Sequence, residues 1–300
     1  MTEIFLQLAP IFLYFLIGVL LRRAGVADRS HGDFVLRLAF FVTLPLLILT
    51  SVSETRLTAD KALLPVANIV VNVLCLGVAL LATRPMRLAR PTQGSIALST
   101  MIVNNAFMFP FILAIYGDTG FADAVLFDFG NALMVATVTY ATAFRYSDES
   151  FDRAAMLKRI AKAPVFSALL LGVVLSVTDT SLPPFVIRVI DPVADMTAPL
   201  ILIALGISFS LSLADARLAA LAIAVRMGLG LAVGLAFATL AGFEGETFAV
   251  VALCSAAPIG FMALTFTSLA KLDRRLTSTA VSLSILVGLI YIPVLMFFFE

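Results

Sequence analysis

The sequence predicts an all-α membrane protein of ten transmembrane helices, arranged as two inverted five-helix repeats in which helices four and nine are broken. Composition is the first reason: 61% of the 300 residues are hydrophobic and only 13% are charged. A soluble domain carries charge on about a quarter of its residues. Lipid must therefore face most of the exterior. The other two reasons are the number of long apolar stretches and a motif that occurs once in each half of the chain.

Ten apolar stretches have about the length that a helix needs to cross a bilayer. They are 4–21, 34–53, 62–83, 94–116, 121–144, 163–178, 192–213, 217–241, 246–270 and 276–299. The longest hydrophilic segment, 146–162, lies between the fifth and the sixth stretch. We therefore predict a first repeat over 1–150, a second repeat over 151–300 and no soluble domain.

The Lys and Arg residues predict the orientation, because they concentrate in cytoplasmic loops. Most of the 20 fall in loops on one side of the predicted spans, whereas only Arg56, Lys61 and Arg188 fall on the other. Both termini are then expected outside the cytoplasm, in a multi-pass protein of the cell membrane. The first apolar run, which ends at Arg22 and Arg23, is expected to remain as a membrane helix rather than to be cleaved.

Several classes of function receive no support. A net charge of +1 gives no basis for binding nucleic acid. Cys75 and Cys254 lie in apolar runs and are expected to be small core residues, so we predict no metal site and no cofactor. The single histidine, His31, is expected to be a surface residue.

An internal repeat is the basis of the inverted arrangement. The segment Thr43–Leu49 (TLPLLIL) resembles Thr197–Ile203 (TAPLILI), and a second proline follows in each half, Pro110 and Pro258, at a similar spacing. Halves of five spans each must be inserted with opposite orientation, an architecture found in many secondary transporters.

The second prolines predict where an anion would bind. Pro110 and Pro258 are near the middle of their spans, where a proline removes a backbone hydrogen bond and kinks or breaks a helix. Two broken helices would place half-helix N-termini, which carry partial positive charge, near the bilayer midplane. The alternative is that these prolines only bend packed helices.

Every asparagine of the chain lies inside a predicted span and must face protein or water. Asn68 and Asn72 share one helix face, and so do Asp128 and Asn131. For Asn68 and Asn72 we favour hydrogen bonding between helices. For Asn104, Asn105 and Asn131 we favour a role in lining the substrate site.

Asp128 and Arg226 are the acid and the base placed well inside spans, where an unpaired charge is costly. Asp128 is a candidate to carry a coupled proton, and Arg226 could hold a substrate carboxylate with two hydrogen bonds. The alternative is that the two form a structural pair or reach separate interfaces.

Together these features resemble the auxin efflux carrier family in its short bacterial form. The resemblance covers essentially the whole chain and rests on the order of short motifs. They are Leu44-Pro45, Asn104-Asn105 through Pro110, Tyr116-Gly117, Leu126 to Asn131, Ala198-Pro199 with Ala204-Leu205-Gly206, and Ala256-Ala257-Pro258.

The resemblance implies a fold similar to that of bile-acid symporters, in which spans four and nine cross at their prolines around the substrate. It also implies a scaffold of spans one, two, six and seven that often forms a homodimer, and a moving bundle of the other spans. The family's crossover asparagine corresponds to Asn104 or Asn105. Span nine departs from the family, because Ser255 and no asparagine stands near Pro258.

The leading hypothesis is therefore a secondary transporter, not an enzyme, that moves a small organic anion by elevator-type alternating access. Family substrates include indole-3-acetate and dicarboxylates such as malate. The residues expected to bind substrate are Asn104, Asn105, Pro110, Asn131, Ser255, Pro258 and Arg226. Proton and sodium both remain open as coupling ions. The alternatives are an intramembrane enzyme, for which no histidine lies in a span, and a channel or receptor.

Overall fold

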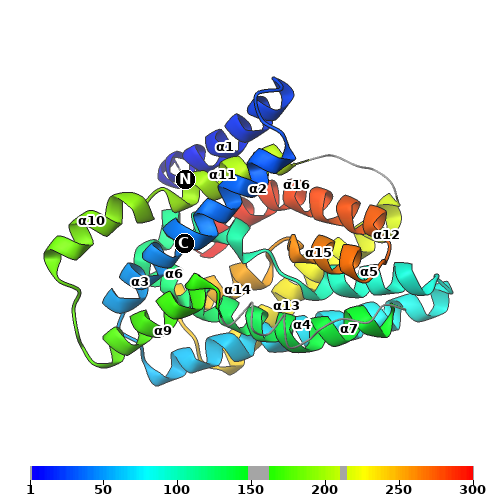
Figure 1. Ribbon diagram of the computed structural model, residues 1–300. Coiled ribbons are helices and arrows are strands. Elements are labelled where there is room, and N and C mark those ends of the chain that lie inside the picture. The colour runs from blue at the N-terminus through cyan, green and yellow to red at the C-terminus, as the bar shows by residue number, and fades with distance from the viewer. Residues whose placement is uncertain (1, 148–161, 210–214, 300) are drawn as a thin grey trace. The chain divides into compact units, whose positions relative to one another are not determined.

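The protein is helical throughout the part that the computed structural model describes, residues 2–147, 162–209 and 215–299 (Figure 1). Those ranges contain no β-strand, only one isolated pair of bridged residues. The predicted boundary between the halves, at 150, and most of the hydrophilic segment 146–162 lie outside the described residues.

Within the described residues, seven helical segments are long and apolar enough to cross a membrane. They are Leu6–Arg23, Arg29–Glu54, Ala59–Met86, Asn105–Arg145, Pro184–Ser208, Ala216–Leu240 and Arg274–Phe299. Two further apolar helices, Pro164–Val177 and Gly245–Ser255, are shorter. The predicted all-α membrane class is thereby confirmed.

The chain divides into two compact units, each built from both halves of the sequence. Unit 1 comprises Met1–Lys61, Ala106–Val125 and Lys158–Phe209. Its helices are α1 (Thr2–Arg23), α2 (Arg29–Leu38), α3 (Leu44–Glu54), α9 (Pro164–Val177), α10 (Pro184–Ala194) and α11 (Thr197–Ser208), with a π-helical segment at Ala39–Thr43.

Unit 2 comprises Ala62–Asn105, Leu126–Leu157 and Ser210–Glu300. Its helices are α4 (Leu63–Thr83), α5 (Arg90–Met101), α7 (Tyr140–Arg145), α12 (Ala216–Ile223), α13 (Gly230–Leu240), α14 (Gly245–Ser255), α15 (Met262–Leu269) and α16 (Arg274–Phe299). In this unit Val135–Thr139 and Ala224–Leu229 are π-helical, and a short 3₁₀ turn lies at Arg84–Met86. Another 3₁₀ turn, Ala59–Ala62, falls where the chain passes from unit 1 to unit 2. Helix α6 (Asn105–Met134) contributes residues to both units.

Small residues allow close helix packing in unit 1. Helix α1 packs on α11, and α3 packs on α9. A Cβ atom at Gly18 would lie 2.9 Å from the Cα atom of Gly206, and in the second pair a Cβ atom at Gly172 would lie 3.0 Å from the Cβ atom of Val52. Membrane helices have little hydrophobic drive to associate, so backbone approach at small residues provides the packing contacts.

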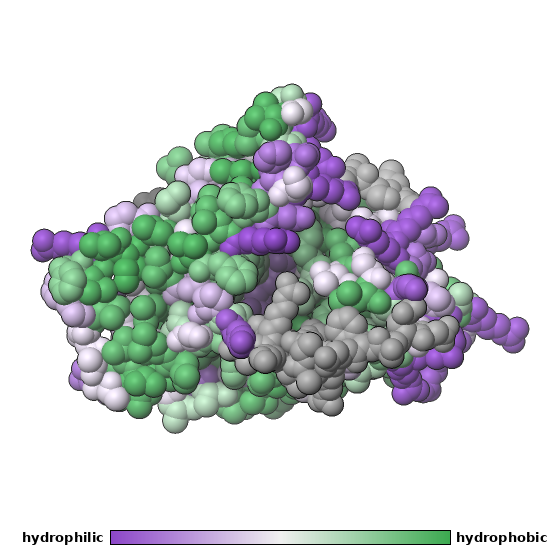
Figure 2. Space-filling view, viewed as in Figure 1, coloured by the Kyte–Doolittle hydropathy of each residue, from purple (hydrophilic) through white to green (hydrophobic). Residues whose placement is uncertain are grey.

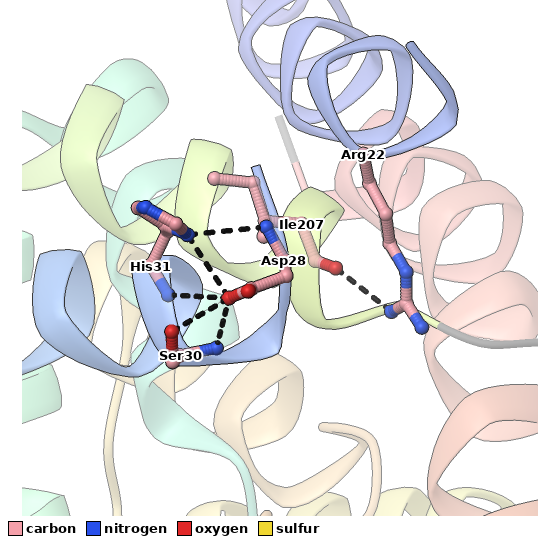
Figure 3. Close-up of polar contacts among 5 residues, drawn as sticks. All are labelled: Arg22, Asp28, Ser30, His31 and Ile207. Atoms are coloured by element: carbon pink, nitrogen blue, oxygen red, sulfur yellow. Dashed lines mark hydrogen bonds and ion pairs between the residues drawn. The ribbon is translucent and has the colours of Figure 1, made fainter. Parts of the chain in front are cut away.

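Polar contacts fix two helix ends of unit 1 (Figure 3). The Asp28 carboxylate accepts hydrogen bonds from the backbone N–H groups of Ser30, at 2.7 Å, and His31, at 3.2 Å, and so caps α2. Hydrogen bonds from Ser30 and then His31 hold the pKa of Asp28 well below its usual value. At the C-terminal end of α11, Arg22 Nη1 donates to the carbonyl of Ile207, in the last turn, at 2.8 Å and to that of Phe209, just after the helix, at 2.9 Å.

The surface is apolar over broad areas of the face seen in Figure 2. Large apolar side chains that are at least 70% exposed include Phe185, Val189, Leu240, Ile290 and Phe298. In a soluble protein such exposure would favour aggregation, whereas a lipid-facing surface is apolar by necessity.

Both spans predicted to be broken are interrupted in unit 2. Helix α5 ends at Met101 before α6 begins at Asn105, and α14 ends at Ser255 before α15 begins at Met262. The second break contains Pro258, as predicted. The first break lies at 102–104 and not at Pro110, which lies inside α6. One proline costs α6 one hydrogen bond, whereas the residues at 102–104 bond to another segment of the chain.

Candidate functional site

The two interrupted stretches of unit 2 run antiparallel and bond to each other through their backbones. The Asn104 N–H donates to the Pro258 carbonyl at 2.9 Å, and the Gly260 N–H donates to the Ile102 carbonyl at 2.8 Å, on either side of a bridge between Val103 and Ile259. Unpaired backbone groups are costly inside a membrane, so these stretches satisfy each other. We call this arrangement the crossover.

The crossover requires glycine at one position. A Cβ atom at Gly260 would lie 2.6 Å from the Val103 carbonyl oxygen, which is closer than any side chain tolerates. The Ile259 N–H takes no part in the backbone pairing of the crossover and donates to Ser284 Oγ of α16 at 3.1 Å. The crossover is therefore a specific backbone arrangement that α16 supports.

Four helix ends adjoin the crossover. The C-terminal ends of α5 and α14 lead into it, and the N-terminal ends of α6 and α15 leave it. Helix C-termini present free carbonyls with partial negative charge, whereas N-termini present free N–H groups with partial positive charge. Centres that attract a cation and centres that attract an anion therefore occur at the same place in the fold.

A carboxylate and two amides lie beside the crossover. Asn105 Nδ2 donates to Asp128 Oδ1 at 2.7 Å, and Asn131 Nδ2 donates to the same oxygen at 3.0 Å. The Oδ1 atoms of Asn105 and Asn131 are buried and have no hydrogen-bond partner among the residues that the structure describes. The cluster therefore combines a carboxylate with two amide oxygens that are free to accept a further hydrogen bond. The predicted shared face of Asp128 and Asn131 is confirmed.

Gly117 makes the contact between Asn105 and Asp128 geometrically possible, although both belong to α6. The backbone at Gly117 has φ 60° and ψ −155°, which interrupts the helix and lets the chain reverse between the two residues. This region of backbone conformation is essentially restricted to glycine. The motif Tyr116-Gly117 thus has a structural role in assembling the cluster.

Arg226 is fully buried in the π-helical segment 224–229 and bonds to three acceptors. Its Nη2 donates to the Ser255 carbonyl at 2.7 Å, and its Nη1 donates to Asn72 Oδ1 at 2.6 Å and to the Thr100 carbonyl at 3.5 Å. Asp128 and Arg226 therefore have separate partners and do not form an ion pair. A grip on substrate by both terminal nitrogens would require these hydrogen bonds to break.

Glycines of α13 create room for this contact. A Cβ atom at Gly230 would collide with the Ser255 carbonyl oxygen and lie 2.9 Å from Arg226 Nη2, and one at Gly234 would collide with the Ser255 side chain. Ser255 is fully buried, and within the described part of the chain its Oγ has no hydrogen-bond partner. The structure thus brings Ser255 to Arg226 and α13, while Pro258 joins Asn104 in the crossover.

Pro110 belongs to unit 1, apart from the residues of the crossover. It lines a small apolar niche with Leu47, Ala198 and Ile201, which come from the two copies of the repeated motif. The structure therefore groups Asn104 with Pro258, and Asn105 with Asp128 and Asn131, but it places Pro110 with the repeated motif.

Two polar features were not singled out as functional from the sequence. Asn72 both donates to Asn68 Oδ1, at 2.6 Å, and accepts from Arg226, so the asparagine pair of α4 serves the arginine as well as its own helix. Lys61 Nζ forms an ion pair with Asp123 at 2.6 Å, and the Asp123 side chain is fully buried. The contact of Asn72 with Arg226 and that of Lys61 with Asp123 could not be predicted, because the partners lie far apart in the sequence.

Comparison with known proteins identifies the family. A family model described as "membrane transport protein" matches residues 3–296. The chain belongs to this membrane transport protein family. The predicted resemblance to auxin efflux carriers is thereby confirmed, and membership implies a multi-pass membrane transporter.

Two archaeal proteins are similar to this chain over nearly their whole length. An uncharacterized transporter of Methanothermobacter thermautotrophicus is 25% identical over 284 residues, which cover 93% of this chain and 92% of the relative. An uncharacterized transporter of Methanocaldococcus jannaschii is 22% identical over 287 residues, which cover 92% of each chain. Both names support transport and specify no substrate.

Proposed function

We propose that this protein is a secondary transporter that moves a small organic anion across the cytoplasmic membrane by elevator-type alternating access. The observation that carries the proposal is the crossover, in which two interrupted helices bond to each other through Asn104 and Pro258. Interrupted helices near the bilayer midplane are the usual substrate sites of transporters built from repeats.

The packing of unit 1 supports an inverted repeat. When Thr43 is aligned with Thr197, Gly18 corresponds to Gly172, and Val52 corresponds to Gly206. The contact of Gly18 with Gly206 therefore has a counterpart in the contact of Gly172 with Val52. Two halves related by a pseudo-two-fold axis produce paired contacts of this kind.

Ten spans, five in each half, fit the described helices and the distribution of Lys and Arg. The shorter helices α9 and α14 would belong to the sixth and ninth spans, and α5 would begin the fourth. The positive-inside rule then places both termini outside the cytoplasm.

The division into two units supports relative motion of two bodies. Unit 1 contains the first, second, sixth and seventh proposed spans, and unit 2 contains most of the others, including the crossover. We propose that unit 1 is the static scaffold, through which a homodimer would form, and that unit 2 carries the substrate.

The substrate carboxylate would bind at the N-terminal ends of α6 and α15, where partial positive charge favours an anion. Asn104, Asn105 and Asn131 would donate or accept hydrogen bonds, beside Pro258 and Ser255. Asp128 would carry a coupled proton. Pro110 would act indirectly through its packing in unit 1.

The test is binding and transport by purified protein. Mono- and dicarboxylates and indole-3-acetate are first screened for an increase in the midpoint of thermal unfolding, since a ligand of the folded state must stabilise it. The stabilising compound is then used for counterflow in proteoliposomes. Asn105→Ala and the Asn104/Asn105 double alanine variant should lose most of the shift. The control is Thr239→Ala, which alters an exposed hydroxyl bonded to its own helix.

Asp128→Asn separates coupling from binding. We expect it to abolish uptake driven by a pH gradient while counterflow of substrate persists. The proposal fails if no carboxylate binds or exchanges, and the site is wrong if the double alanine variant keeps full affinity.

A further inference from the structure

Arg226 has a buried positive charge that no carboxylate neutralises in the part of the chain the structure describes. Its hydrogen-bond partners are two backbone carbonyls and one amide oxygen, and its Nε is buried without an acceptor. The guanidinium is fully buried. A lone charge in such a place is costly, so the surrounding groups must compensate it.

The compensation comes from the ends of two helices. Ser255 is the last residue of α14, and Thr100 stands next to the last residue of α5. Each helix C-terminus is equivalent to about −0.5 elementary charge. The two ends together present about one negative charge, which the single positive charge of Arg226 matches.

The position of Arg226 is also special with respect to the repeat. On the alignment of Thr43 with Thr197, Arg226 is equivalent to Asn72, the residue whose Oδ1 accepts its hydrogen bond. Equivalent residues that touch must lie next to the pseudo-two-fold axis. The guanidinium is therefore held between the paired C-terminal ends of α5 and α14, where Gly230 leaves room for it.

We propose that Arg226 is a tethered cation: its guanidinium fills the position where the carbonyls of two interrupted helices would otherwise bind a mobile metal cation, so the protein needs no sodium to reach its transport-competent structure. Carbonyls at the ends of interrupted helices are a known type of sodium site in transporters. The consequence for coupling rests on the proposed function, whereas the cation role itself concerns the folded protein alone. Arg226 is then a positioning residue, which holds the ends of α5 and α14 at the crossover and does not bind substrate itself.

The test uses guanidinium ion to replace the missing side chain. Without substrate, the thermal midpoint of the wild type should be the same in sodium chloride and in choline chloride. Arg226→Ala should unfold at a lower temperature, and millimolar guanidinium chloride should raise its midpoint saturably, by about 3 °C. Urea, which has a similar shape but no charge, should not. The control is Arg188→Ala, at an exposed arginine, which should show no response to guanidinium.

Three results would overturn the proposal. They are stabilisation of the wild type by sodium over choline, an equal response of Arg226→Ala to urea and guanidinium, and no response of the folded variant to guanidinium. If Arg226→Ala does not fold, Arg226→Lys and Arg226→Met are compared. Lys keeps the charge and should give the higher midpoint, whereas equal midpoints would contradict the charge argument.

These measurements use no substrate, so an error in the proposed anion class leaves them unaffected. Once a substrate is known, counterflow in sodium-free vesicles extends the test to transport. Flux that requires sodium would refute the tethered cation while leaving the proposed function intact.

Discussion

Gly18 of α1 and Gly206 of α11 touch through their backbones, with no room for a side chain at either of the two positions. A Cβ atom at Gly206 would collide with the Phe15 carbonyl oxygen, so Gly206→Ala must push the helices apart. We expect a loss of about 1–3 kcal/mol in the free energy of unfolding, measured by denaturation in detergent. Gly77→Ala is the control, because no described atom outside its own helix lies within 4 Å of a Cβ atom at that position. An equal effect of the two would contradict the close packing.

Gly117 holds a backbone conformation that costs other residues about 1–3 kcal/mol. Gly117→Ala should lower the thermal midpoint, and it should weaken anion binding because Asn105 and Asp128 meet only if the chain reverses there. Gly228→Ala has open space around the new methyl group and tests the effect of alanine alone. Normal anion affinity in Gly117→Ala would show that the reversal does not assemble the cluster.

Removing one partner of the pair between Lys61 and Asp123 should be costly, because the Asp123 side chain is fully buried. Lys61→Met should lower the free energy of unfolding by up to about 3–5 kcal/mol. Part of this loss should return in the double variant with Asp123→Asn, which removes the uncompensated charge. Arg56→Met, at an exposed position, controls for the loss of a cation. Simple additivity of the two substitutions would argue against a coupled pair.

The Asp28 cap should make stability depend on pH. Its hydrogen bonds lower the pKa of the folded form, so the carboxylate stabilises the protein above the unfolded pKa of about 3.9 and loses this effect as the pH falls through the folded value. The difference in thermal midpoint between the wild type and Asp28→Ala should be full at pH 7 and should shrink only in strong acid. Asp33→Ala is the control, because it removes a carboxylate from the same helix and keeps the Asp28 cap. A constant difference at every pH would show that charge is unimportant at this cap.

Features that depend on local pattern could be predicted from the sequence. Apolar length gave the membrane class, and helical spacing placed Asn131 beside Asp128. A proline flanked by small residues marked the break at Pro258. Each of these depends on residues within a turn or two of one another, where hydropathy and backbone chemistry decide the outcome.

Features that depend on distant segments could not be predicted. The first break lies at 102–104 because the backbone there bonds to residues near 258. The local sequence does not indicate that the helix is interrupted at these residues and not at Pro110. The partners of Arg226 come from α4, α5 and α14, so the sequence could mark the arginine as costly but could not say what compensates it.

In the proposed inverted repeat, the hydrogen bond between Arg226 and Asn72 limits how alike the two halves can be. At a position beside a pseudo-two-fold axis, identical halves would present either two arginines, which repel, or two asparagines, which supply no charge to the helix ends. One donor and one acceptor satisfy the position only if the halves differ. If the two halves arose from the proposed inverted repeat, a pair of identical ancestral subunits could not have made this contact, and the duplicated sequence must have diverged before the charge could be buried there.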